Sequence, residues 1–403
     1  MFNLKEKNGI LKRKNGITLI SLVITIIILL ILATISIQSL TNTGIFKRAQ
    51  EAKNAMENAE TEQAEMLNEY ENALNGYYTP NPKPKSTLVV DNVNTVLSTT
   101  ENTELKDAYG NKIIVPAGFK IVSDSTTNNA QTVNQGIVIE DVTKTADGTA
   151  TETNGSQFVW IPVGTIYTDV ARTDANAKTI ELNRYTFDTN GNPTPQNESV
   201  IETYYQELEI SDKGNTVAKS IANFKTSVIT NGGYYIGRYE ARTITERRNE
   251  TDVLTPITVK GTDQIYNWVT QLQAAQLAQN MYNSNKFTSD LMNSYSWDTA
   301  TLFLQTCGTN KKYSRQNSVN TTLSQTGTNT QEIKDVQCNV YDMASNVVEW
   351  STETSSYTSN NSIFPSVSRG GFYNFVDDFM SGRDYYSTFI SYDSFGIRPL
   401  LYL

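Results

Sequence analysis

The chain has 403 residues, with 33 Lys and Arg against 42 Asp and Glu, two cysteines and no histidine. Its length exceeds that of a usual single core, so two or more structural units are expected. Without imidazole, Ser-His-Asp and Cys-His catalysis are excluded. The formal charge of −9 argues against a nucleic-acid partner, because such binding depends on Lys and Arg that neutralise phosphates.

A basic leader and a long apolar segment open the chain. The first 16 residues carry five Lys or Arg against one Glu, and no further charge appears until Lys47. Between Ile17 and Ile37 the only polar side chains are Ser and Thr, which can bond back to their own helix carbonyls. About 20 such residues cross the ~30 Å hydrocarbon layer, whereas the core of a cleavable signal peptide has only about 7 to 15. We therefore predict a transmembrane helix at 17–40, with the N-terminus inside and the rest outside.

The leader ends at Gly16, and the apolar segment opens with the residues ITLIS, starting at Ile17. This pattern resembles a type IV prepilin. The resemblance implies cleavage after Gly16 on the cytoplasmic side, methylation of Ile17, and a single-pass protein of a bacterial cell membrane with an extracellular head. Polymerising pilins usually carry Glu at the fifth mature position, where this chain has Ser21. Membrane retention is expected, and assembly with other pilins stays open.

Residues 41–76 are predicted to form a helical stalk. Apolar and small residues recur there at alternating spacings of four and three, with Glu and Lys around them. Because this seam is rich in Ala, a helix packed on its own head is favoured over a coiled coil. Asn75 and Gly76 end the helix, and the Pro-spaced run that follows indicates a semi-rigid linker, placed at 77–103.

From about Thr87 onward the pattern changes to short strand-like runs separated by Asn, Gly, Thr and Asp. Strands are expected at 112–115, 119–122, 136–140 and 157–163. Helices are expected at 217–228, 266–282 and 297–304. Strands mixed with a few helices, without regular alternation, predict an α+β head over 104–403. The polar run 308–331 predicts a long mobile loop.

Four blocks of the head occur in the order found in a known family. They read GGYYIGRYEA at 232–241, VYDMASNVVEW at 340–350, SRGGFY at 368–373 and FGIRPL at 395–400. Together they resemble the formylglycine-generating enzyme, or sulfatase-modifying factor, family. The resemblance covers residues 104–403 and implies a variant of the C-type lectin fold.

The family's enzymes bind copper through a pair of nearby C-terminal cysteines and oxidise a cysteine of a client protein. In this chain no cysteine follows Cys338, and Gly382 to Asp384 stand where the first of that pair would be. We therefore predict a non-catalytic head with no cofactor beyond a structural Ca²⁺. The alternatives are a formylglycine-generating oxidoreductase with a relocated cysteine and a structural minor pilin.

Residues 372–394 mix aromatic side chains with Asp, Asn and Ser. From Phe372 to Phe395 there are nine aromatics in 24 positions, against 10% for the whole chain. Rigid aromatics beside small polar groups are typical of antibody paratopes, and the interleaved carboxylates make full burial costly. Inward packing of these strands is the alternative. Contacts to an unidentified protein or glycan ligand are predicted for Phe372, Tyr373, Asn374, Phe375, Asp377, Asp378, Arg383, Asp384, Tyr385, Tyr386, Tyr392 and Asp393.

The same segment resembles the variable region of ligand-binding proteins made by diversity-generating retroelements, which share this fold. In those proteins the segment before a C-terminal GFRP-like strand is hypermutated at adenine-rich codons. Asn, Tyr, Ser, Asp, Phe and Ile are outcomes of mutating an Asn codon, and they dominate residues 372–394. The resemblance implies a diversified binding surface.

Asn346 and Glu349 lie in a block where the family often coordinates calcium through oxygen ligands. Ser345 and Val348 replace the usual Gly and Trp, so structural hydrogen bonding is preferred to a Ca²⁺ site, and Trp350 is expected in the core.

Cys307 and Cys338 would face an oxidising exterior, and both a disulfide and two separate buried thiols stay open. A buried ion-pair network, rather than a ligand role, is predicted for four charges in aromatic, strand-like blocks: Arg238, Glu240, Arg369 and Arg398.

Overall fold

The computed structural model describes residues 19–42, 48, 51–56, 59, 63, 86–122, 131–196, 205–207, 220–243, 245–262, 264–325, 327, 335–355, 358–359, 362–373, 375 and 377–403. The chain forms two units, Met1–Lys85 and Ser86–Leu403. The second unit, called the head below, contains all the strands among the described residues.

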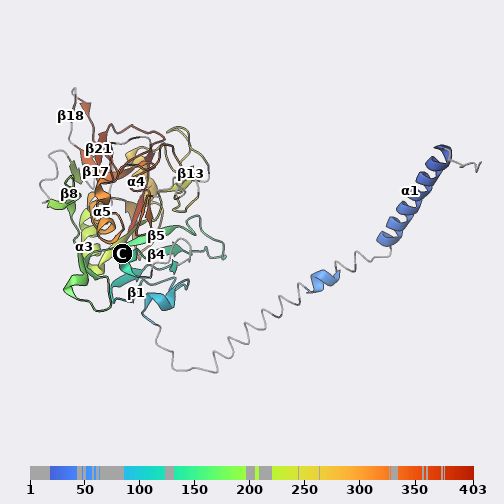
Figure 1. The fold of residues 1–403 in the computed structure, drawn as a ribbon, viewed down its shortest axis with the longest axis horizontal. Coiled ribbons are helices and arrows are strands. Elements are labelled where there is room, and N and C mark those ends of the chain that lie inside the picture. Colours follow the sequence, from blue (N-terminus) through green and yellow to red (C-terminus); the bar gives the residue numbers. More distant parts are fainter. Residues whose placement is uncertain are drawn as a thin grey trace, which may run out of the picture. The chain divides into compact units, whose positions relative to one another are not determined.

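Helix α1, Leu19–Asn42, belongs to the first unit (Figure 1). Its side chains are exposed over residues 21–35. The Thr25 hydroxyl donates to the Ser21 carbonyl over 2.7 Å, and the Thr34 hydroxyl donates to the Leu30 carbonyl over 2.5 Å. The hydroxyls of Thr25 and Thr34 are thus satisfied within the helix, as the sequence predicts.

Within the described part of the chain, no helix combines the length and the apolarity needed to cross a membrane. The transmembrane helix at 17–40 therefore stays a prediction. Gly16 and Ile17, the expected processing site, lie outside the described residues, as does most of the stalk at 41–76. The described positions of that stretch, 41–42, 48, 51–56, 59 and 63, are helical.

The head begins earlier than the sequence predicts. Residues 86–103 were expected in the linker 77–103, yet they pack on the head. Val89, in the short 3₁₀ turn Val89–Asn92, is fully buried, and the Asn94 N–H donates to the Ile121 carbonyl over 2.7 Å. The change of pattern at about Thr87 agrees with this start of the head, whereas the linker bound at 103 follows from the extent of the family resemblance. The linker prediction is wrong for 86–103.

A six-stranded antiparallel sheet forms one layer of the head. The last strand of the chain lies inside this sheet, between strands β14 and β11, and the middle strands are buried along their whole length. In spatial order the strands are β14 (Thr288–Leu291), β23 (Pro399–Tyr402), β11 (Gly233–Gly237), β5 (Gln157–Pro162), β4 (Val138–Asp141) and β3 (Phe119–Val122).

A second sheet is built around β17 (Val348–Ser355), which is buried at every position. β17 pairs with β10 (Tyr205–Glu207) on one side and β20 (Ser366–Arg369) on the other, and β22 (Phe395–Gly396) runs parallel to its start. β21 (Arg383–Tyr386) pairs only with β20 among the described strands, so it is an edge strand.

Six two-stranded ribbons complete the described β-structure. They are β1 (Thr103–Lys106) with β2 (Lys112–Val115), β6 (Gly164–Tyr167) with β7 (Ala177–Ile180), β8 (Arg184–Phe187) with β9 (Pro193–Gln196), β12 (Arg242–Thr243) with β13 (Gln264–Ile265), β15 (Val336–Gln337) with β16 (Val340–Tyr341), and β18 (Thr358–Ser359) with β19 (Ser362–Ile363).

Three capped helices pack on these sheets (Figure 1). α3 (Ile221–Asn231) contacts β11 and β23, and it ends at Gly232, whose φ of 78° suits glycine. α4 (Gln271–Gln279) and α5 (Ser294–Cys307) each begin with a capping box. Because α4 and α5 each contact strands of both sheets, they join the two sheets around one core.

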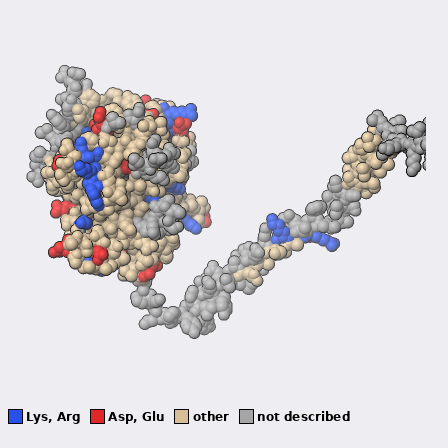
Figure 2. All heavy atoms as spheres, viewed as in Figure 1, with Lys and Arg blue, Asp and Glu red and all other residues tan. Residues whose placement is uncertain are grey.

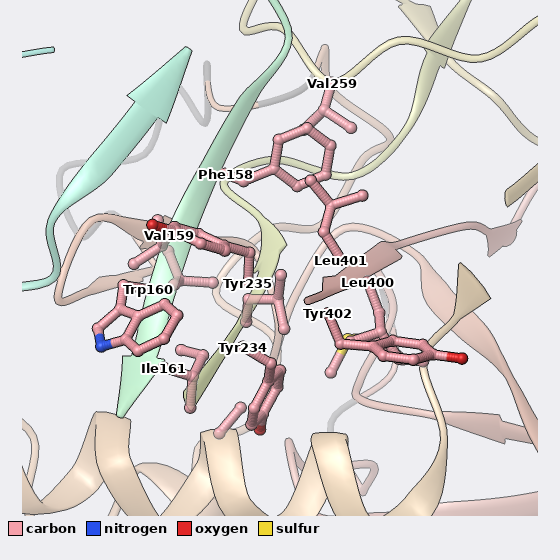
Figure 3. Packing of buried hydrophobic residues seen from close by; sticks show 14 of the residues in the cluster. Phe158, Val159, Trp160, Ile161, Tyr234, Tyr235, Val259, Leu400, Leu401 and Tyr402 are labelled. Carbon is pink, nitrogen blue, oxygen red and sulfur yellow. The ribbon is translucent and has the colours of Figure 1, made fainter. Parts of the chain in front are cut away.

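Most of the core is one contiguous cluster of apolar side chains, and Val367 with Tyr385 forms a small separate one. Residues of β5, β11 and β23 face one another in it, as Figure 3 shows. The rings of Trp160 and Tyr235 lie 4.9 Å apart, and the buried Tyr234 hydroxyl donates to the Ser296 carbonyl of α5 over 2.5 Å. On the face of the head seen in Figure 2, charged side chains are scattered among a larger uncharged area.

The α+β prediction is confirmed, and the strands are predicted more closely than the helices. β2 and β3 have the expected bounds, and β4 and β5 differ from them by one or two residues at an end. α4 is shorter than the predicted 266–282, because the Thr270 capping box starts it and Trp268 has a φ of 55°. α5 is longer than the predicted 297–304, because the cap at Asn293 adds its first turn.

The polar run 308–331 is not a mobile loop where the structure describes it. Tyr313 and Ser314 are buried in the 3₁₀ turn Tyr313–Arg315. Asn320 is buried as well, and its side chain bonds to Asn346. Polar composition misled here, because the side chains of Tyr313 and Asn320 bond other buried polar groups.

Four charges of a buried cluster tie α5, β17, β20 and β21 together, and a fifth, Arg184 of β8, lies 3.9 Å from Glu353. Arg369 bonds Asp298 of α5 and Glu353 of β17, each over 2.5 Å. Arg383 bonds the other oxygens of the same two carboxylates, over 2.5 and 2.8 Å. All four side chains are at most 6% exposed. The ion-pair role predicted for Arg369 is thus confirmed.

Arg398 forms a second buried ion pair, with Glu349, at 2.6 Å. Its other donors bond the carbonyls of Gly237 and Tyr341. Of the other two charges of the predicted network, Arg238 donates to the Gln157 side chain, and Glu240 accepts from Asn346.

Replacing Arg369 by Met should destabilise the head strongly, because it removes two charge-assisted bonds and leaves two carboxylates with Arg383 as their main partner. Breaking a buried pair from one side costs about 3–5 kcal/mol. Urea unfolding of the full chain measures this. The control is Arg248→Met in an exposed pair with Glu246, which should cost less than about 1 kcal/mol. Equal losses in the two variants would contradict the assigned role.

Candidate functional site

The predicted ligand-binding segment, 372–394, leads into and out of the edge strand β21. Its backbone is held by bonds to distant segments. The N–H groups of Met380 and Ser381 donate to the carbonyls of Gln316 and Ser314 over 3.0 and 3.1 Å, and the Trp297 indole donates to the Met380 carbonyl over 2.9 Å. A Cβ at Gly382 would lie 2.8 Å from the Phe379 carbonyl oxygen, so the chain is closely packed there. The segment is therefore fixed in place by main-chain contacts.

A cavity of about 340 Å³ opens beside this segment. One wall comes from the segment itself, through Asp377, Asp378, Phe379 and residues 381–384. The rest of the lining comes from Tyr185, Thr186 and Phe187 of β8, together with Arg315. The Arg315 guanidinium lies over the Phe379 ring, 3.5 Å from its centroid.

Three carboxylates line this cavity, and two of them are partly buried. Asp377 is exposed, whereas Asp378 and Asp384 have intermediate exposure. Burial, together with the charges of Asp384 and Asp377, raises the pKa of Asp378 to about 7. Burial also raises the pKa of Asp384. The cavity thus concentrates negative charge at a site that water solvates incompletely.

Arg383 also lines the cavity, but its guanidinium points inward. It bonds Asp298 and Glu353 and is 6% exposed. Those carboxylates hold the guanidinium charged, and they raise the pKa of Arg383 despite its burial. Of the cavity residues predicted from the sequence, Asp377, Asp378 and Asp384 belong to the lining, and Arg383 directs its guanidinium to Asp298 and Glu353.

A second group of predicted residues forms an aromatic surface next to the block at 340–350. The rings of Phe372 and Phe375 stack at 5.1 Å. The Tyr373 hydroxyl donates to Asp393 over 2.9 Å, and burial followed by that bond raises the pKa of Tyr373 to about 12. Tyr392 is 51% exposed and has its ring 6.4 Å from that of Trp268.

The aromatics of the segment divide between core and surface. Tyr386 meets Trp350 and Phe395, with ring centroids 6.0 and 4.8 Å away, and Tyr385 packs on Val367. In contrast, Phe375 and Phe389 are 45% and 74% exposed. Inward packing therefore holds for some of these residues and surface exposure for others. Asn374 lies outside the described residues.

Sequence reasoning missed the wall that β8 and Arg315 provide. Tyr185, Thr186 and Phe187 precede the segment by about 190 positions, and Arg315 lies in the run that was expected to be a mobile loop. Their alternating pattern predicts a strand at best. Nothing in a single sequence places that strand opposite Asp378.

Asn346 and Glu349 do not fit a calcium site. Asn346 is fully buried; its side-chain oxygen accepts from Asn320 and Ser324, and its side-chain nitrogen donates to Glu240. Both Glu349 oxygens accept from Arg398. The oxygens that calcium would need are already engaged, and the described residues contain no metal-binding group of three or more acidic or thiol side chains. Structural hydrogen bonding, the preferred prediction, is what the contacts show.

Buried carboxylates gather around Arg398. Besides Glu349, they are Glu240, Asp335 and Asp342, each at most 3% exposed. Burial and the nearby Asp335 charge raise the pKa of Asp342 to about 7. One guanidinium does not balance four carboxylates, so protons must neutralise part of this cluster.

Both cysteines are free thiols. Burial raises the pKa of Cys307 to about 11 and the pKa of Cys338 further. At neutral pH both are protonated, which is the form that reacts poorly. Of the two alternatives left open by the sequence, the structure shows unbonded thiols.

The head is an α+β domain with a two-sheet core and a cavity at an edge strand. It is similar to two solved structures. The variable protein 1 of Treponema denticola matches with 13% identity and a TM-score of 0.31, covering 62% of this chain and 97% of that chain. PvdO from Pseudomonas aeruginosa matches with 11% identity and a TM-score of 0.29, covering 62% of this chain and 95% of that chain.

Likenesses this distant define neither the family nor the function of this chain. No family model matches the sequence, and no curated protein matches it.

The stability of the head should fall as the pH rises from about 4 to about 7. The folded-state pKa of Asp342, about 7, lies above its ordinary value of 3.8, so the folded state binds this proton more tightly than the unfolded state does. The stabilisation that this proton gives the folded state is present at low pH and is lost as the pH rises from about 4 to about 7. Asp342→Asn should flatten the pH dependence, as measured by urea unfolding between pH 4.5 and 8.

The matched control is Asp188→Asn. Hydrogen bonds from Asn192 lower the pKa of Asp188, so this group titrates below the pH range of the test. The change of unfolding free energy with pH should therefore be the same in this variant as in the unchanged chain. An unchanged slope in Asp342→Asn would show that another group governs the pH dependence.

Proposed function

We propose that this protein displays a ligand-binding head on the outside of a bacterial cell, and that residues 372–394 carry the binding surface. The observation that supports binding most directly is the cavity of about 340 Å³ along this segment, with exposed Phe375, Phe389 and Tyr392 on the same segment. Cavities of a few hundred Å³ with aromatic walls and a few polar groups are typical of ligand sites. The ligand is a protein or a glycan.

The division between scaffold and surface supports the same proposal. Main-chain bonds and the inward-facing Arg383 fix the segment, while other side chains face outward. Such an arrangement tolerates side-chain changes at the surface without loss of the fold. This arrangement suits a segment diversified by a retroelement. The diversification hypothesis further requires that the neighbouring DNA contain a near-copy of the coding segment and a reverse transcriptase gene.

We propose that the head is not an enzyme of the formylglycine-generating type. Two features support this: the thiols of Cys307 and Cys338 have raised pKa values, and they lie outside the cavity lining. At Gly382, near the position of the family's first cysteine, a side chain would meet the Phe379 carbonyl. Restoring a cysteine there would require the backbone to shift.

Membrane anchoring completes the proposal. It rests on the basic leader, the uncharged segment after Gly16 and the helix α1, whose described side chains are exposed. We further propose prepilin-type cleavage between Gly16 and Ile17. The full chain should then stay in the membrane fraction after carbonate extraction and be digested by protease added to intact cells. Resistance to that protease would contradict outward display.

Binding is tested with the full chain in detergent, selected against surface proteins and glycans. Phe389→Ser combined with Tyr392→Ser should weaken binding of the selected ligand roughly tenfold or more, since exposed aromatics are common anchors. Tyr385 and Tyr386 are unsuitable for this test, because they pack against the sheet.

The control is Val253→Ser, which removes another exposed apolar side chain, 83% exposed, outside the segment. It should leave binding unchanged. Unchanged binding in the double variant would contradict the placement of the site.

A further inference from the structure

The cavity beside β21 carries negative charge that its own lining does not balance. Asp377, Asp378 and Asp384 line it. Arg383 also lies in the lining, but its charge is taken up by Asp298 and Glu353. Among the lining residues this leaves three carboxylates against the guanidinium of Arg315, which stacks on Phe379.

The partly buried carboxylates also lack hydrogen-bond donors. Within the described residues, no donor bonds the side chain of Asp378 or Asp384. Other aspartates of the head differ: Asp107, for example, accepts from the backbone N–H groups of Tyr109 and Asn111. Half-buried carboxylates without donors are unfavourable, and a cationic group in the cavity would relieve both the missing bonds and the mutual repulsion.

The rest of the lining suits the stem of a cationic side chain. Tyr185 and Phe187 have ring centroids 6.1 Å apart on one wall, and Phe379 lies on the other. Aromatic faces attract cations and pack against methylene chains. Arg315 over Phe379 is an example of this geometry within the chain.

The size and rigidity of the cavity restrict what can enter. About 340 Å³ is near the lower end for ligand sites, so a single side chain fits better than a large ligand. The bonds from Met380 and Ser381 to the 313–317 segment hold the acidic wall in place, so little ordering is needed on binding.

We propose that this cavity receives a lysine or arginine side chain of a partner protein, with Asp378 and Asp384 as the anionic contacts and the rings of Tyr185, Phe187 and Phe379 around its stem. This inference rests on the proposed binding function and names the chemistry of the partner. An anionic ligand is disfavoured by the three carboxylates. A neutral sugar would leave their repulsion in place.

The test uses calorimetric titration of the full chain with three probes, N-acetyl-lysine amide, N-acetyl-arginine amide and N-acetyl-norleucine amide. At pH 8 at least one basic amide should bind about tenfold or more tightly than the norleucine amide. Asp378→Asn combined with Asp384→Asn should abolish that preference. Glu152→Gln, an exposed carboxylate outside the lining, should retain it. Binding should weaken at pH 5.5, where Asp378 is protonated.

Equal binding of the norleucine amide, or an unchanged preference in the Asp378→Asn, Asp384→Asn variant, would overturn the cation assignment. If the ligand selected earlier still requires Phe389 and Tyr392 in that case, the proposed binding function stands and only the chemistry of the cavity is wrong. If the selected ligand proves to be a neutral glycan that the Asp variant binds normally, the cation assignment is likewise wrong.

Discussion

The buried cluster of Asp298, Glu353, Arg369 and Arg383 is the interaction on which the rest of the head depends. These four charges come from α5, β17, β20 and β21, and Arg184 of β8 pairs with Glu353 as well, so the cluster joins a helix that contacts both sheets to the edge strand of one of them. Such a cluster is stable only when every member is present, because removing one leaves its partners buried and unpaired. These ion pairs fix the position of β21 and therefore the position of the cavity wall.

The same ion pairs explain how the segment 372–394 contains both side chains that support the fold and side chains that face outward. Arg383 is directed into the core by the two carboxylates, and the Gly382 carbonyl accepts from Arg369 over 2.8 Å. Strand alternation then puts Asp384 and Tyr386 on the face opposite Arg383. Tyr386 lies against Trp350, whereas Asp384 reaches the cavity. The outward-facing side chains of this short segment can therefore vary without disturbing the core.

Sequence reasoning succeeded where the signal is local. Short β-branched runs mark β2 and β3, and charges inside aromatic blocks mark Arg369 and Arg398 as buried pairs. It failed where the outcome depends on a distant partner. The burial of Asn320 requires Asn346, and the burial of residues 86–103 requires the sheet they pack on.

For the candidate site, the sequence predicts the acidic and aromatic wall but not the wall facing it. Asp377, Asp378 and Asp384 stand out by composition, whereas Tyr185, Phe187 and Arg315 become neighbours only through long-range contacts. The sequence also could not separate Tyr386 from Phe389, because both are aromatics in one run, yet one is half-buried beside Trp350 and the other is 74% exposed.

The place of β23 has a consequence for how the head is made. This strand, Pro399–Tyr402, lies between β14 and β11 rather than at an edge. The six-stranded sheet therefore lacks an interior strand until these residues have been synthesised, and its pairing joins parts of the chain far apart in sequence, which is slow to form. The pairing of β14 and β11 with β23 can therefore form only after residues 399–402 have been made.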